Sequence, residues 1–117
     1  MTEATETARA YYDAIDAGDY DRFADLLAPD VVHERPDRTI EGRETLVAFM
    51  REGRPNEETA HEVEAVYVEA DGGDVAVRGR LRDADGAPMF AFVDVFEVEA
   101  AEEDRTPRIS RIRTYTQ

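Results

Sequence analysis

The spacing of hydrophobic and polar residues changes near Ala60, and this change divides the chain into two parts. Before Ala60, apolar side chains recur every three or four residues, which is typical of helices with one buried face. After it they alternate with polar side chains, which is typical of strands. Three N-terminal helices followed by a run of strands predict an α+β fold, with the helices packed in the concavity of a curved antiparallel sheet.

Each predicted helix combines an apolar stripe with a start or stop signal. Gly18 ends the first helix, Asp19 can cap the second, and Pro29 closes the second. The third helix follows Gly42 and stops at Gly53. The stripe of the first helix is formed by Ala4, Ala8, Tyr11, Tyr12 and Ile15.

A short strand is predicted at residues 31–35, between the second and third helices, and Pro36 ends it. Alternation along this strand puts His33 and Arg35 on one face and Glu34 on the other. Polar groups therefore gather on one side of the strand.

Four longer strands are predicted over residues 61–70, 75–82, 87–99 and 108–115, joined as an antiparallel meander. In the second of them, arginines occupy one face and apolar residues the other, so one face is buried and one is in water. In the third, both faces are apolar, and a single layer of helices covers only one of them.

The second face of that strand is expected to meet another copy of the chain, because a face so apolar is unfavourable in water. The sequence therefore predicts a homodimer formed through the sheet. The residues of this face are Met89, Ala91, Val93 and Val95.

Asp94 interrupts the other face of the same strand, where it stands among Phe90, Phe92 and Phe96. A carboxylate on an apolar face must find a partner, reach a polar cavity or stay protonated. We expect burial to raise its pKa, unless Arg35 lies close enough to pair with it. Two interpretations stay open: a functional carboxyl in a cavity, and a structural carboxylate that has partners or is turned outward by a bulge.

The composition fits one domain spanning residues 1–117. With 117 residues, 42% of them hydrophobic, the chain can bury one modest core. The absence of cysteine excludes disulfides, thiolate nucleophiles and zinc-thiolate sites. The start is not signal-like and no apolar run approaches about twenty residues, so a cytoplasmic protein is expected.

Acidic residues outnumber basic ones by 28 to 14, every basic residue is an arginine, and the net charge is −14. This charge repels nucleic-acid phosphates and anionic lipid surfaces, so neither nucleic acid nor a membrane is expected as a partner. A surplus of acids without lysine resembles the proteins of salt-accumulating halophiles, in which concentrated salt screens the repulsion. We interpret the charge as an adaptation to salt.

Several short segments carry a resemblance to a known family through their order and spacing. They are residues 11–19 (YYDAIDAGD), 28–31 (APDV), 40–44 (IEGRE) leading to Phe49, 92–95 (FVDV), and 108–109 (RI) continuing to Tyr115. Together they resemble the SnoaL-like and ketosteroid-isomerase-like branch of the nuclear transport factor 2-like superfamily across nearly the whole chain. This resemblance implies a cone-shaped, cystatin-like roll that encloses an apolar pocket for a small molecule, commonly as a homodimer.

For catalysis, the resemblance implies an oxyanion hole made by a helix tyrosine and a protonated aspartic acid, beside a carboxylate base. Tyr11 and Asp94 stand at the matching positions of this sequence. Arg35 occupies the position of the base, and a guanidinium stays protonated and cannot abstract a proton from carbon. His33 could be a relocated base or could pack at the pocket mouth. Arg35 could pair with Asp94 or bind an anionic ligand.

The wall of the implied pocket is expected to include apolar side chains, each of which could equally be ordinary core. They are Ile15, Met50, Val77, Phe92, Phe96 and Ile112. Tyr11 could likewise be a core tyrosine, and His61 is expected at the surface. No close spacing of histidines and carboxylates indicates a metal site, and no cofactor is expected.

Two functions of different classes are consistent with the sequence. The first is an enzyme that isomerises, cyclises, dehydrates or hydrolyses a small carbonyl compound, with Tyr11 and Asp94 donating hydrogen bonds to a developing oxyanion. The second is a non-catalytic binding protein in which Arg35 holds the acidic or carbonyl head of an apolar ligand. An interaction-only dimer with a filled core is a third.

Overall fold

The computed structural model describes residues 3–53, 59–69, 74–99 and 107–117. The helices are α1 (Glu3–Ala17), α2 (Tyr20–Asp25) and α3 (Arg43–Ala48), which continues into a π-helical segment, η1 (Phe49–Gly53). The strands are β1 (Leu27–Glu34), β2 (Thr39–Glu41), β3 (Ala60–Val68), β4 (Asp74–Arg82), β5 (Pro88–Glu99) and β6 (Arg108–Thr116). The predicted α+β class, with three helices packed against a curved sheet, is confirmed.

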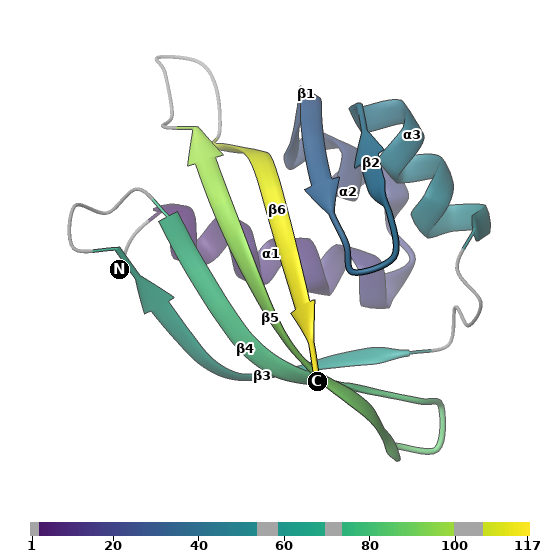
Figure 1. Cartoon of the computed structure of the whole chain (residues 1–117). Helices are drawn as coiled ribbons and strands as arrows, with labels where there is room; N and C mark the ends of the chain where they lie inside the picture. Colours follow the sequence, from purple (N-terminus) through teal and green to yellow (C-terminus); the bar gives the residue numbers. More distant parts are fainter. Residues whose placement is uncertain (1–2, 54–58, 70–73, 100–106) are drawn as a thin grey trace.

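The strands form one six-stranded sheet in the order β2-β1-β6-β5-β4-β3. The four long strands predicted after Ala60 are present and form the expected antiparallel meander. The sheet also has one parallel pair that the sequence did not indicate, because β1 runs parallel to β6. The sheet is therefore mixed, and β1 with β2 extends it beneath α2 and α3 (Figure 1).

The segment around Pro29 is strand, where the sequence predicted the end of a helix. Helix α2 already ends at Asp25, and Leu27 pairs with Ile109 of β6. Pro29 has no backbone N–H for a ladder, and the register of β1 shifts between Leu27 and Val32. Pairing with a strand eighty residues away decides this assignment, and local spacing cannot detect such a partner.

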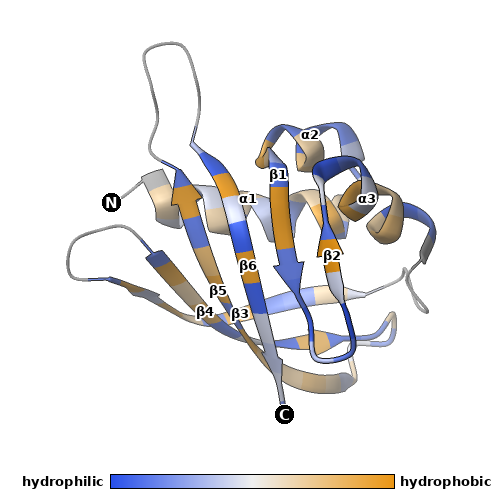
Figure 2. Ribbon diagram, turned by 45° about the horizontal axis from the view of Figure 1, so that its top comes forward, coloured by the Kyte–Doolittle hydropathy of each residue, from blue (hydrophilic) through white to orange (hydrophobic). Residues whose placement is uncertain are grey.

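Helix α1 crosses one face of the curved sheet and closes the core on that side (Figure 1). Tyr11 and Tyr12 are each only 2% exposed, and their rings lie 5.2 Å and 5.8 Å from the ring of Phe96. Figure 2 shows separate hydrophobic bands along β6, between hydrophilic ones, and the two isoleucines of this strand, Ile109 and Ile112, are fully buried. Side chains from β4, β5 and β6 complete the core, among them Val75, Val77, Phe96, Ile109 and Ile112.

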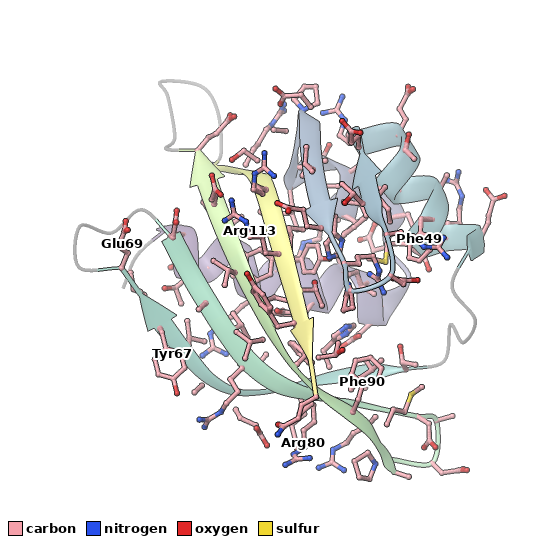
Figure 3. All side chains as sticks on the ribbon, in the orientation of Figure 1. Phe49, Tyr67, Glu69, Arg80, Phe90 and Arg113 are labelled. Carbon is pink, nitrogen blue, oxygen red and sulfur yellow. The ribbon has the colours of Figure 1, made fainter. Side chains whose placement is uncertain are left out.

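The opposite face of the sheet is more mixed than the sequence indicated. Ala91, Val93 and Val95 are half-buried on this face. Met89, which the sequence placed in the same row, instead lines the cavity described below, because the register of β5 shifts near its start. The strand register sets Arg78 and Arg113 beside this apolar row. Figure 3 shows the side chain of Arg113 on the sheet surface away from α1.

Arginines on this face pair with glutamates on neighbouring strands. The Nε atom of Arg80 lies 3.2 Å from Glu64, and a nitrogen of Arg113 lies 2.9 Å from Glu97. The face therefore has an apolar centre bordered by ion pairs. No described helix is long and apolar enough to cross a membrane.

Candidate functional site

A cavity of about 230 Å³ lies between α1, η1 and the concave side of the sheet. Ile15, Met50 and Phe92, three of the side chains expected on its wall, do line it. Phe49 and Phe90, labelled in Figure 3, add aromatic surface from η1 and β5. Its polar lining includes Tyr11, His33, Arg35, His61, Asp94 and Thr114.

Val77, Phe96 and Ile112 were also expected on the wall, but the structure places them behind it. Their side chains are at most 1% exposed, and they belong to the packed core under α1. One face of a strand can line the core at one end and the cavity at the other. The alternation of residues therefore predicts which face is buried, but not where along the strand the cavity begins.

Asp94 is 6% exposed and receives two short hydrogen bonds. The hydroxyl of Tyr12 donates to Oδ2 at 2.7 Å, and the hydroxyl of Thr114 donates to Oδ1 at 2.6 Å. Burial raises the pKa of the Asp94 carboxyl, although the two hydrogen bonds and the charges of His61 and Arg35 oppose that shift. Burial of the side chain is the largest of these effects, so the pKa of Asp94 is shifted upward, the direction expected from the sequence.

The tyrosine that contacts Asp94 is Tyr12, not Tyr11 as the sequence analysis assigned. Tyr11 lines the same cavity, while its ring packs 5.3 Å from that of Phe23. Burial, with the neighbouring Asp94 charge second, raises the pKa of Tyr12 well above its usual value, so this hydroxyl keeps its proton. Adjacent helical positions point about 100° apart, and the exact rotation of α1 over the sheet decides between them.

His33 reaches Asp94 through Thr114. Its Nε2 atom lies 2.7 Å from the Thr114 hydroxyl oxygen, which has given its proton to Asp94, so Nε2 carries the hydrogen and donates. Burial, helped by the Arg35 charge, lowers the pKa of His33 to about 3, and the ring is neutral at working pH. Nδ1 is buried and has no hydrogen-bond partner within the described residues.

A second histidine on the wall, His61, is held by a carboxylate. Its Nδ1 lies 2.7 Å from Oδ1 of Asp16, and its backbone N–H donates to Oδ2 of the same side chain at 3.0 Å. With Nδ1–H donated to Asp16, the free nitrogen of the neutral ring is Nε2. The rings of Tyr12 and Phe92 lie on its sides, 5.1 Å and 5.8 Å away.

His61 was expected at the surface, but its side chain is only 16% exposed. His61 and Val63 are half-buried while Glu62 and Glu64 are exposed, so the alternation along β3 did carry the signal. Asp16 likewise follows Tyr12 by four residues, a spacing that brings two side chains to one face of a helix. Only the packing of α1 against β3 shows that this face meets His61.

Arg35 stands where the cavity meets an outer groove. No ion pair joins it to Asp94 among the described side chains, which removes one of the two alternatives for this residue. Its guanidinium carbon lies 5.0 Å from the centre of the Phe49 ring, within cation–π range. The part of the chain that the structure describes holds no group of three or more acidic or histidine side chains able to bind a metal ion.

This arrangement combines, in one mostly apolar cavity, a carboxyl whose pKa burial raises and an imidazole whose tautomer a carboxylate sets. Such a pair can donate a hydrogen bond at one point and accept a proton at another. The fold defines a class of protein, the α+β roll in which three helices pack against one curved sheet.

Residues 8–104 match the family of the SnoaL-like domain, and the chain belongs to this family. No curated protein matches the sequence. A candidate ketosteroid isomerase from Kribbella flavida is 27% identical, with a TM-score of 0.73 over 98% of this chain and 78% of its own.

More distant solved structures share the fold alone. A candidate polyketide cyclase from Sinorhizobium meliloti is 18% identical, with a TM-score of 0.75 over 98% of this chain and 100% of its own. A candidate isomerase of the SnoaL-like family from Agrobacterium tumefaciens is also 18% identical, with a TM-score of 0.77 over 100% and 99%.

Proposed function

We propose that this protein is an enzyme that removes a proton from the carbon next to the carbonyl group of a small compound. The observation that supports it is that Asp94 and the pair of His61 and Asp16 share one cavity. Asp94 donates a hydrogen bond from its protonated carboxyl to the carbonyl oxygen, where negative charge develops. The Nε2 atom of His61 accepts the proton from carbon, and Asp16 stabilises the imidazolium that forms.

Tyr12 and Thr114 hold the Asp94 carboxyl in place in this proposal, and Tyr12 assumes the part that the sequence analysis gave to Tyr11. The base is His61, because His33 is fixed to Thr114 through Nε2 and its pKa is too low to hold a proton. Isomerisation, cyclisation and dehydration all begin with removal of such a proton. The cavity volume of about 230 Å³ lies below the range typical for drug-sized ligands, which favours a small substrate.

Deuterium uptake by phenylacetone tests the proposal directly. In deuterated buffer, the wild type should accelerate loss of the CH2 signal from the proton NMR spectrum of this ketone. His61→Gln and Asp94→Asn should each lower the rate by a factor of about 10² or more, the usual contribution of acid–base and oxyanion groups. Tyr67→Phe is the matched control, because Tyr67 is 53% exposed and does not line the cavity.

The proposal is contradicted if the wild type exchanges the ketone no faster than buffer, or if both cavity variants keep the full rate. Circular dichroism of each variant establishes that the fold is intact.

The second candidate is a non-catalytic binding protein. It is favoured by Arg35, a cationic donor at the cavity edge that no described carboxylate approaches closely. Tight binding of an apolar acid without any proton exchange would support this function over the first.

We also propose a homodimer through the sheet face that bears Val93. The apolar centre of that face supports it, and the bordering ion pairs would form the polar rim of the interface. Light scattering in molar salt should report twice the chain mass of 13.2 kDa. Val93→Asp should give monomers, whereas Val68→Asp, on the edge strand β3, should leave the dimer intact. Wild-type monomers at micromolar concentration would contradict the proposal.

A further inference from the structure

Among the residues that the structure describes, only a long ion pair compensates the charge of Arg35, which stands at the edge of the cavity. The chain has twice as many acidic as basic residues, and several described arginines have a carboxylate oxygen much closer than that of Arg35. Arg82 lies 2.8 Å from Glu62, for example, and Arg111 lies 2.6 Å from Glu34. Of the carboxylates in the described part of the chain, only that of Asp37 pairs with Arg35, at 3.9 Å and largely in solvent. The charge of Arg35 is therefore left for another partner.

Its position suits a ligand that enters the cavity. The side chain is 27% exposed, and its Nε atom is buried with no hydrogen-bond partner among the described residues. The backbone N–H of Arg35 donates to the oxygen of Arg38 at 2.8 Å, which fixes the tip of the β1–β2 hairpin. Phe49 packs against the guanidinium from η1, so the donor fork is held at the cavity edge without being neutralised.

The charge of Arg35 also acts on the buried groups of the cavity. Burial is the main cause of the lowered pKa of His33, and Arg35 lowers it further. Burial raises the pKa of Asp94, and Arg35 is one of the groups that work against this. The guanidinium thus lies within electrostatic reach of the carboxyl that receives the carbonyl oxygen in the proposed reaction.

We propose that Arg35 binds a carboxylate on the substrate, which makes the substrate a small carbonyl compound that also carries a carboxylate. This inference rests on the proposed function, which places the carbonyl group of the substrate at Asp94. It adds a binding site for a second group of the same substrate, its carboxylate. The planar fork of a guanidinium matches the two oxygens of a carboxylate. The apolar stem between the two groups packs on Phe90 and Phe92.

Substrate binding then prepares the acid of the reaction. A carboxylate on Arg35 cancels the positive charge that opposes the raised pKa of Asp94, and adds a negative charge nearby. Both changes favour the protonated carboxyl. An acid substrate therefore increases the fraction of Asp94 that can donate a hydrogen bond to its carbonyl oxygen.

Three ligands of the same shape test the inference: phenylacetate, phenylacetamide and phenylacetone. Binding of the first two is measured by NMR titration in 1 M potassium chloride, where the Debye length of about 3 Å suppresses the repulsion from the net charge. Wild type should bind phenylacetate about tenfold or more tightly than phenylacetamide, as expected for hydrogen bonds to a charged group. Arg35→Gln should abolish this preference.

Arg38→Gln is the matched control. Arg38 stacks on the same Phe49 ring, with its guanidinium carbon 5.2 Å from the ring centre, but it does not line the cavity. This variant should keep the full preference for phenylacetate. Carbon-detected NMR should also show Asp94 titrating at higher pH with phenylacetate bound than with phenylacetamide bound.

Equal binding of the acid and the amide by wild type would overturn the inference, as would a preference that survives in Arg35→Gln. The outcomes separate this inference from the proposed function. Exchange of phenylacetone without a preference for phenylacetate leaves the enzyme and removes the carboxylate site. A preference for phenylacetate without exchange of either phenylacetone or a keto acid such as levulinate keeps the carboxylate site and removes the enzyme.

Discussion

His33 provides the most quantitative prediction, because it is a buried histidine held neutral by the fold. Its folded pKa is about 3, against 6.5 in an unfolded chain. Between these values the unfolded chain binds a proton that the folded protein excludes. His33 therefore destabilises the protein increasingly as the pH falls from about 6.5 towards 3.

The magnitude follows from these two values. At pH 5 the unfolded imidazole is about 97% protonated and the folded one about 1%, which corresponds to about 2 kcal/mol in favour of unfolding. At pH 7 the same calculation gives about 0.2 kcal/mol. Acidification from about pH 7 to pH 5 should thus cost about 2 kcal/mol of stability through this residue alone.

Urea unfolding of wild type and His33→Gln isolates this contribution from the many acidic groups, which titrate in both proteins. Glutamine suits the comparison because its amide nitrogen can take the place of Nε2 and donate to Thr114. The stability of wild type relative to the variant should fall by about 2 kcal/mol between about pH 7 and pH 5. A difference that stays constant over this range would refute the reasoning, and with it the buried, neutral state of His33.

Asp94→Asn should show a pH dependence of stability opposite to that of His33→Gln. Because the folded pKa of Asp94 is raised, the free energy of unfolding of wild type relative to this variant should fall as the pH rises from about 4. A relative stability that increases with pH would contradict this prediction. Gly79→Ala should lower the free energy of unfolding in urea by about 1–3 kcal/mol or more, since a methyl group there would strike the backbone oxygen of Glu62 and approach the Phe92 ring to 2.9 Å. Gly86→Ala is the comparison, because its added methyl group meets open space and only the φ of 83° causes strain. The thermal midpoint should rise from dilute buffer to molar potassium chloride as salt screens the charge of −14, and a flat midpoint would remove the interpretation as salt adaptation.

The candidate site could be predicted from the sequence only one strand or helix at a time. Asp94 was recognisable because a carboxylate in an aromatic row is costly unless its environment compensates. His33 and Arg35 were recognisable because they share one face of a short strand. Each of these three does line the cavity. The partners that define their chemistry come from other elements, and no local pattern indicates them.

Thr114 shows the limit clearly. It follows Ile112 on the inner face of β6, where it resembles any other strand residue of that face. The register of β5 against β6 sets it opposite Asp94, and the parallel register of β1 against β6 brings His33 to its other side. The register between two strands depends on the packing of the whole sheet and cannot be predicted from the local sequence pattern.

The sequence by itself determined the α+β class, the order of the long strands and the face on which most polar groups of the site lie, because hydrophobic periodicity is a local property of each element. Only the tertiary structure decided that Tyr12 rather than Tyr11 contacts Asp94, that Asp16 holds His61, and that β1 joins the sheet in parallel. These outcomes depend on the rotation of α1 and on strand register. Both are set by how the elements pack against one another, since a rotation of about 100° or a shift of one residue changes the side chain that enters the cavity.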